Sequence, residues 1–307
     1  QSSSQNIVIV NNGSAALNVS STNFSGANAA DFSVSNGGAF SLAPGVSRNV
    51  QVSFNPASLG VKNAVLEVAS DDADEPLVSV NVSGEGTAVP AANISLQEVK
   101  IGGASDVASV STSAALAAAD GHVYVAAISS KAFRSVSAVS GLGLVWTEQR
   151  GQCAGRNQTG VSIWTATGTP SASSDVVTAA LSGSASNAVI AVTRYSGVGS
   201  VGSVTSANSN GVSGACSGGT DAASYSVNLN TTGAKSVVHA AVAMRSRAHT
   251  AGGGFTEQML VSQGESGGSI AGVAVLDQLI DSSSTVDVTG TFSGTVDWAV
   301  AAVELKP

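Results

Sequence analysis

Short apolar stretches alternate with polar turns along the first 88 residues. Within residues 48–54, Val50, Val52 and Phe54 recur at every second position, which places them on one face of a β-strand. The sequences NNG, LAPG and NP separate such stretches and are typical of turns. Helical periodicity is absent. The pattern predicts a small antiparallel sandwich with strands at residues 6–10, 17–21, 31–35, 48–54, 64–70 and 77–83.

From residue 93 onward the same kind of pattern continues over a much longer stretch. Residues 189–192 and 237–238 are apolar at consecutive positions, as expected for strands covered on both faces. Strands are predicted at residues 93–100, 122–129, 144–148, 161–166, 175–181, 187–195, 224–228, 236–244, 255–261, 269–279, 285–292 and 297–305. Residues 84–92, GEGTAVPAA, have the composition of a linker. The chain is therefore expected to be all-β, with a small antiparallel sandwich at residues 1–88 followed by a larger jelly-roll-like β-sandwich at residues 89–307.

The pattern of residues 144–168 predicts a β-hairpin against which the other strands pack. Trp146 and Trp164 each lie in an apolar strand, and the loop QRGQCAGRNQTG between them contains Cys153. Cys216, in the Gly-rich sequence GACSGG, is the second of two cysteines. An even number of loop cysteines favours a disulfide in a secreted protein, whereas a cytosolic protein would keep two free buried thiols. We predict a Cys153–Cys216 disulfide, worth roughly 3–4 kcal/mol on the loop-entropy model.

The N-terminal region resembles a known family. The sequences NNGSAALNV, ADFS, LAPG, VSFNP, GVKNAVLEVASDD and VSGEG resemble Hydin/ASH-type, choice-of-anchor D modules. Because these modules are immunoglobulin-like sandwiches of large secreted bacterial proteins, the resemblance implies that fold and an extracellular location for residues 1–88. The family usually has a strand before the SSS-x-x-I-x-I element at which this chain starts.

Residues 120–307 resemble a β-sandwich module of large, mostly uncharacterised secreted bacterial proteins. The resemblance rests on GHVYVAAIS, WTEQRGQCAGRNQTGV, AVIAVTRYSGV, GACSGGT and VDWAVAAVELKP. It implies a β-sandwich and an extracellular location, and it implies no activity.

Charged residues are scarce in this chain. Asp, Glu, Lys and Arg make up 10% of the residues, and the net charge is −8. A weakly charged surface tolerates close contact with copies of itself. The chain has no run of basic residues, so docking to nucleic acid is not expected, and no stretch approaches the roughly 20 apolar residues of a membrane span. No cofactor is expected. The chain starts at Gln1 without Met or a signal peptide, as expected for a processed product.

The sequence GESGG at residues 264–268 matches the G-x-S-x-G pattern of serine hydrolases and resembles the nucleophile segment of trypsin-like proteases. Such chemistry needs a His beside Ser266, and the chain offers His122, His239 and His249. None of them has the sequence context of a trypsin-like protease, and no strand–turn–helix surrounds Ser266. We therefore predict that Ser266 is catalytically inert and that the protein is not an enzyme.

Two further sets of residues invite a binding role. The cluster Asp71, Asp72, Asp74 and Glu75 lacks the spacing of a calcium loop, so a turn is predicted and no metal. The candidates for stacking on sugar rings are Trp146, Trp164, Trp298 and Tyr195. A Trp in an apolar strand, however, usually packs in a core. Tyr195 and Arg194, at the end of a strand, are expected to be exposed.

These observations predict a secreted, non-enzymatic structural or adhesive subunit whose main partner is a copy of itself. The alternative is a carbohydrate-binding or cell-surface adhesion module of a larger secreted protein, with glycans as partners. The absence of the family's first strand leaves a sheet edge unpaired, and we expect a strand from an adjacent subunit to fill it and to build an open-ended filament. Residues 93–100 and 297–307 are the candidate donors. Coverage of this edge within one chain, by residues 1–4 and a loop, is the alternative.

Overall fold

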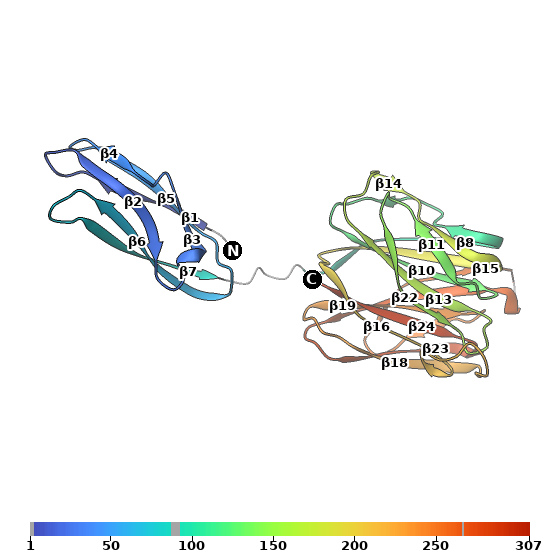
Figure 1. The fold of residues 1–307 in the computed structure, drawn as a ribbon. Helices are drawn as coiled ribbons and strands as arrows, with labels where there is room; N and C mark the ends of the chain where they lie inside the picture. The colour runs from blue at the N-terminus through green and yellow to red at the C-terminus, as the bar shows by residue number, and fades with distance from the viewer. Residues whose placement is uncertain (1–2, 87–92, 266) are drawn as a thin grey trace. The chain divides into compact units, whose positions relative to one another are not determined.

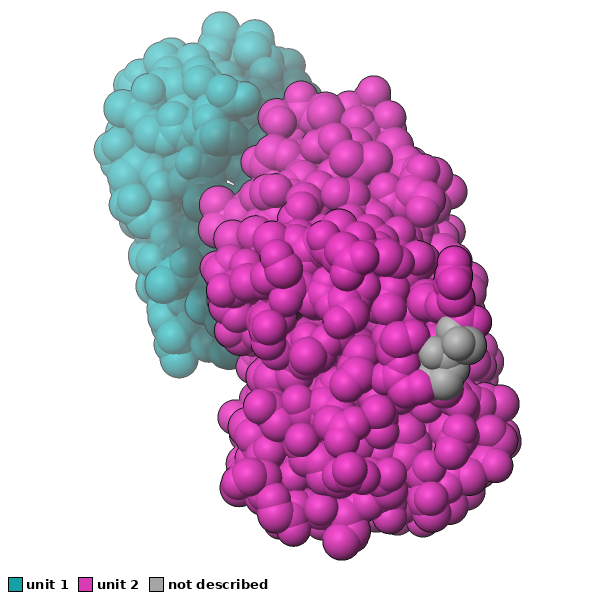
Figure 2. Space-filling model, turned by 90° about the vertical axis from the view of Figure 1, so that its right-hand side faces the viewer, with its two compact units in different colours: residues 1–90 teal, residues 91–307 magenta. Residues whose placement is uncertain are grey.

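The computed structural model describes residues 3–86, 93–265 and 267–307, and the chain forms two compact units at residues 1–90 and 91–307 (Figures 1 and 2). Ser266 and residues 87–92, which belong to the expected linker, lie outside the described residues. The described part of the chain is built almost entirely of antiparallel strands, with two 3₁₀ turns at Ala29–Asp31 and Gly267–Ser269. The prediction of an all-β fold is confirmed.

The N-terminal unit consists of two small sheets that face each other. One has the order β1–β5–β3, with bounds Ser3–Val10, Ser47–Phe54 and Phe32–Ser35. The other has the order β4–β2–β6–β7, with bounds Phe40–Leu42, Leu17–Ser25, Gly60–Ser70 and Leu77–Gly86. The inward residues of these strands form one small core of Val19, Phe32, Val52, Phe54, Ala64, Leu66 and Val68. Each strand predicted here is present, and β4 was not predicted.

The C-terminal unit contains two large sheets and a smaller third one (Figure 1). The first large sheet has the order β11–β15–β10–β13–β12, with bounds Val136–Ser140, Thr178–Ser196, Val123–Lys131, Gly160–Thr167 and Trp146–Cys153, and β8 (Ser95–Ser111) also pairs with β15. The second has the order β17–β16–β24–β19–β22–β21, with bounds Gly211–Val212, Ser200–Asn208, Ala299–Lys306, Ser236–Met244, Ala271–Ile280 and Thr256–Gln263. The third contains β18 (Ala222–Asn230), β23 (Thr285–Val296) and β20 (His249–Ala251), and β9 (Leu116–Ala117) pairs with β14 (Ser174–Asp175).

Three hydrophobic cores hold these layers together. The first lies between the two large sheets, the second between β16, β19, β22 and β24 and the third sheet, and the last on the other face of the first large sheet. A strand between two cores is covered on both faces, and all nine residues of β19 are buried. This explains why its sequence is apolar at consecutive positions.

The long strand β15 was predicted as two strands, at residues 175–181 and 187–195. The intervening sequence SGSAS is small and polar, which is typical of a turn. In the structure β15 continues through it, with a shift in register to β8 between Ala180 and Ala185. The residues before the segment pair with β11 and those after it pair with β10, while β8 pairs with β15 at both of its ends, and this pairing on either side keeps the segment extended.

Both ends of the C-terminal unit pack against one turn, between β15 and β16. Gly199 donates its N–H to the carbonyl of Lys306, 2.8 Å away. Gly197 has φ +76°, and a Cβ at this position would lie 2.5 Å from the carbonyl oxygen of Asn93. Glycine is therefore required where the first described residue of the unit approaches the turn.

Candidate functional site

The structure joins Cys153 and Cys216, with 5.4 Å between their Cα atoms and a sequence separation of 63 residues. Cys153 ends β12 and is buried, whereas Cys216 lies in an exposed loop before β18. The disulfide therefore fastens a surface loop onto the edge of the first large sheet. This is the pairing predicted from the sequence.

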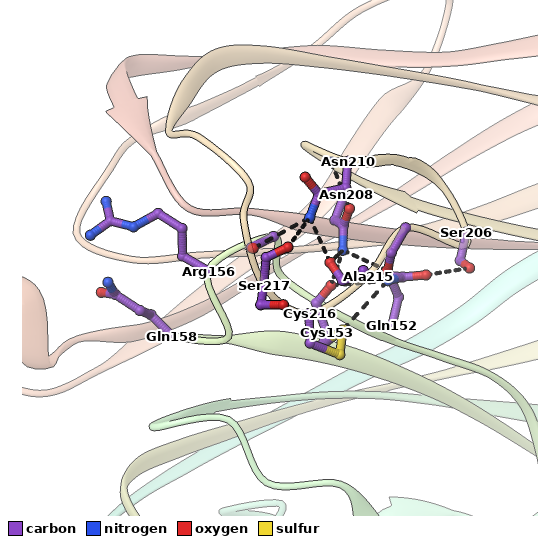
Figure 3. The surroundings of a disulfide bond; sticks show 12 residues. Gln152, Cys153, Arg156, Gln158, Ser206, Asn208, Asn210, Ala215, Cys216 and Ser217 are labelled. Carbon is purple, nitrogen blue, oxygen red and sulfur yellow. Dashed lines mark hydrogen bonds between the residues drawn. A yellow bond between two sulfur atoms is a disulfide. The ribbon is translucent and has the colours of Figure 1, made fainter.

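Side-chain amides hold the same loop in place (Figure 3). Asn208 donates to the carbonyls of Cys153, Gly214 and Ala215 at 2.8–3.0 Å. Asn210 donates to the carbonyls of Ala215 and Ser217 at 2.7 and 3.0 Å. Because each amide satisfies carbonyls that a loop leaves without strand partners, the loop is ordered without regular secondary structure.

The predicted aromatic stacking residues are buried. Trp146 and Trp164 are 8% and 9% exposed, and both lie in the core on the outer face of the first large sheet. Trp298 packs in the second core. Tyr195 is 1% exposed, so the expectation that it lies at the surface is wrong. Pairing of β15 on both sides and packing against the second large sheet cover this side chain.

Tyr195 belongs to a buried cluster that the sequence did not indicate. Its hydroxyl donates to Asp277 Oδ2 at 2.5 Å and lies 2.9 Å from His239 Nδ1, which is 3.0 Å from Asp277 Oδ1. Burial raises the pKa of Tyr195 well above its ordinary value, and the Asp277 carboxylate adds to the effect. The cluster therefore connects β15, β19 and β22 inside the first core, and the phenol of Tyr195 in it is neutral.

A second Tyr–His–acid set lies on the other side of the second large sheet. The hydroxyl of Tyr225 is 3.0 Å from His249 Nε2, and His249 Nδ1 contacts the Glu257 carboxylate. Burial, together with the nearby charge of Glu257, raises the pKa of Tyr225. In both sets the histidine is buried and its hydrogen bonds go to Tyr and a carboxylate.

The third histidine, His122, has its Nδ1 3.1 Å from Nη1 of Arg194. Burial lowers the pKa of His122, and the positive charge of Arg194 lowers it further. Ser266 itself is outside the described residues, so its predicted inertness stays a prediction.

The acidic cluster after β6 forms a turn, as predicted. Asp72 Oδ1 accepts the backbone N–H groups of Asp74 and Glu75, which closes the connection to β7. Asp71 accepts the backbone N–H and the side-chain amide of Asn18, and these hydrogen bonds lower the pKa of Asp71. The described residues contain no group of His, Cys, Asp and Glu that could hold a metal ion.

An open groove runs along one side of the N-terminal unit, between β1 and β7. One part of about 570 Å³ is lined by Ile7, Phe54 and Val82 among others, and an adjoining part of about 240 Å³ shares Ile7 and Val80 with it. We call this the edge groove. β1 and β7 are each the last strand of their sheet, so within residues 3–86 their outer backbone groups have no strand partner.

The edge groove exposes apolar side chains that a closed sandwich would cover. Ile7, Ile9, Val80 and Val82 point toward the core yet are only partly buried. On the outer side of β1, Val8 is 56% exposed and Val10 is 44% exposed. Within residues 3–86, this edge of the sandwich is therefore open.

Both candidate donor strands are already paired within the C-terminal unit. Residues 95–100 form the start of β8, which pairs with β15, and residues 299–306 form β24, between β16 and β19. All but the last residue of β24 are buried. The expectation that either segment fills the groove of a neighbour is wrong, because donation would break these pairs and open the first core.

The comparison with protein families concerns the N-terminal unit. Residues 1–78 match the family model of the ASH domain, described as abnormal spindle-like microcephaly-associated, ASPM–SPD-2–Hydin. The N-terminal unit is an ASH-like module. Its resemblance to Hydin/ASH-type immunoglobulin-like modules is thereby confirmed, whereas the resemblance given for residues 120–307 stays a prediction. No curated protein matches the chain. Among the described residues, no helix is long and apolar enough to cross a membrane.

Proposed function

We propose that the protein is a secreted, non-enzymatic structural or adhesive subunit that polymerises through its ASH-like module, with a strand of one copy pairing in the edge groove of the next. The observation that carries the proposal is the edge groove. Natural sheets protect their edges with charged residues, proline or bulges. β1, with the sequence SSQNIVIV, has none of these over eight residues.

The occupant that fits the groove is an edge strand of a second ASH-like module. The groove offers unpaired backbone groups on both sides and the apolar side chains of Ile7, Ile9, Val80 and Val82. β7, with the sequence LVSVNVSGEG, supplies the alternating valines that such a site accepts. Pairing of β1 with β7 of the next copy is heterologous, and repetition of a heterologous contact gives an open-ended filament.

Other features support the rest of the proposal. A disulfide is typical of proteins from oxidising compartments, which supports secretion. The scarcity of charge lowers the electrostatic repulsion between copies. Glycan binding through Trp146, Trp164 and Tyr195, the alternative, has no support because these side chains are buried.

The test is to place a charge on the edge. We expect Val8→Lys to abolish assembly, because a lysine on an edge strand is one of the devices by which natural sheets prevent pairing with a second strand. Sedimentation velocity and electron microscopy of the full chain over a range of concentrations measure the effect. Val145→Lys is the matched control, since Val145 is also exposed, at 84%, and lies outside any strand.

The wild-type protein should form filaments, Val145→Lys should do the same, and Val8→Lys should stay monomeric. A wild-type chain that remains monomeric at every concentration contradicts the proposal. So does a Val8→Lys variant that assembles as the wild type does, and closed dimers alone would contradict the heterologous pairing.

A further inference from the structure

In the part of the chain that the structure describes, four cations at one end of the C-terminal unit have no carboxylate partner. Acidic residues outnumber Lys and Arg by 20 to 12 in the chain. The Lys and Arg ion pairs among the described residues are Lys100–Glu98, Arg194–Glu98, Arg156–Asp221 and Lys235–Asp281. None includes Lys131, Arg134, Arg245 or Arg247, which we call the cationic end.

Strand pairing brings these residues to the same end of the unit. Lys131 ends β10 and pairs with Asn187, whose amide donates to the carbonyl of Ser269 at 2.9 Å. Arg245 directly follows β19 and its Nη1 lies 3.5 Å from the carbonyl of Gly268. Burial lowers the pKa of Lys131, and the positive charge of Arg245 lowers it further. The two cations are therefore close enough to repel each other.

Of the nearby acidic residues, Asp297 offsets part of this effect, because its negative charge raises the pKa of Lys131. The Asp297 carboxylate is fully buried and accepts the backbone N–H groups of Arg156 and Gln158. Glu265 is exposed, and no ion pair involving it is found among the described residues. Clustered cations without a counter-ion are unfavourable, and a bound anion removes that cost.

A groove of about 520 Å³ is lined by one member of the cationic end, Arg247, and by Ser246, which directly follows Arg245 in the chain. Its size suits one or two sugar rings. Met244, Leu260 and Ile270 give it apolar walls, and Ser246, Ser262 and Arg247 give it hydroxyls and a guanidinium. Among the described residues, the exposed Arg247 has one hydrogen bond, from Nη1 to the carbonyl of Ser246, so the other N–H groups of its guanidinium are available to a ligand. A guanidinium matches a carboxylate through two parallel hydrogen bonds.

We infer that the cationic end and its groove bind an acidic polysaccharide, with Arg245 and Arg247 contacting sugar carboxylates and Ser246 and Ser262 lining the ring site. This inference is independent of filament formation. A saccharide fits better than a nucleic acid, because no aromatic residue lines the groove and unpaired bases are held mainly by stacking on aromatic side chains.

The test uses the full chain and polygalacturonate, with neutral dextran and double-stranded DNA as comparison ligands, in biolayer interferometry at low and physiological ionic strength. The wild-type protein should bind polygalacturonate, should not bind dextran, and should bind DNA more weakly. Salt should weaken the interaction, since screening reduces the attraction of exposed charges. Arg245→Gln combined with Arg247→Gln should raise the Kd for polygalacturonate about tenfold.

The matched control is Lys62→Gln combined with Lys235→Gln, which removes the same charge elsewhere and should change the Kd by less than about twofold. Thermal unfolding checks that both double variants are folded. Absence of polygalacturonate binding by the wild type overturns the inference, and so does an equal loss in the two double variants. Binding of DNA as tight as that of polygalacturonate overturns the assignment to a saccharide.

Discussion

The two units bury their strands to very different extents. No residue of β1 is buried, and in β7 only Gly86 is. In the C-terminal unit every residue of β19 and all but one of β24 are buried. One small core between two sheets leaves the N-terminal unit dependent on a few side chains, whereas three cores make the C-terminal unit complete by itself. The N-terminal unit therefore has less buried apolar surface that holds it folded.

The largest expected effect is on the small core of the ASH-like module. Leu66 is fully buried there, and Leu66→Ala should cost about 3–5 kcal/mol, comparable to the whole stability of a small domain. We expect the unfolding transition of the N-terminal unit to disappear in calorimetry of the full chain. Measurements at low protein concentration avoid the stabilisation that association would add.

Leu276→Ala is the matched variant, because Leu276 is also fully buried but lies in the second core of the C-terminal unit. It should lower the Tm of the C-terminal unit and leave that unit folded. If Leu66→Ala keeps the unfolding transition of the N-terminal unit and lowers its free energy of unfolding by less than about 1 kcal/mol, this unit does not depend on its small core.

Loss of the disulfide should affect the C-terminal unit alone. Replacement of Cys153 and Cys216 by Ser removes the cross-link between two residues that are 63 positions apart in the sequence. It should reduce the free energy of unfolding of the C-terminal unit by about 3–4 kcal/mol. Urea unfolding measures this effect, and addition of reductant to the wild type should reproduce it. An unchanged C-terminal unit would show that the amide network alone holds the loop, and a change in the N-terminal unit would contradict the prediction.

The smallest expected effect concerns the buried Glu304 of β24. Its carboxylate accepts N–H groups from Ser203, Thr232 and Gly233 at 2.7–3.1 Å. Burial alone would raise the pKa of Glu304, but these hydrogen bonds outweigh it and lower the pKa below the ordinary value of 4.5. The stabilisation is therefore present above pH 4.5 and is lost as the pH falls through the lowered pKa.

Glu304→Gln should reduce the free energy of unfolding of the C-terminal unit by about 2 kcal/mol at neutral pH. It should also flatten the dependence of that free energy on pH below 4.5. Unfolding followed between neutral and acidic pH checks both effects. Glu265→Gln, at an exposed position, is the control, and an equal loss in this variant would contradict the role assigned to Glu304.

Strands with a clear apolar pattern were predictable from the sequence, and strands held by their neighbours were not. The alternation of Val50, Val52 and Phe54 indicates β5 without further information. By contrast, β16 has the sequence SVGSVTSAN and is extended because it pairs with β24. No local pattern distinguishes it from a loop.

The buried clusters were missed for a similar reason. Tyr195, His239 and Asp277 lie on three strands up to 82 residues apart, so no spacing in the sequence joins them. Tyr195 was expected at the surface because it is polar and near the end of a strand, and its partners are visible only once the sheets are stacked. The disulfide was predictable because the chain has two cysteines.

The shared turn at Gly197–Gly199 determines how the C-terminal unit would carry a mechanical load. Asn93 and Lys306 both contact this turn, so tension applied through residues 93 and 307 enters and leaves at one corner. The layers behind that corner add little to the distance between the two attachment points.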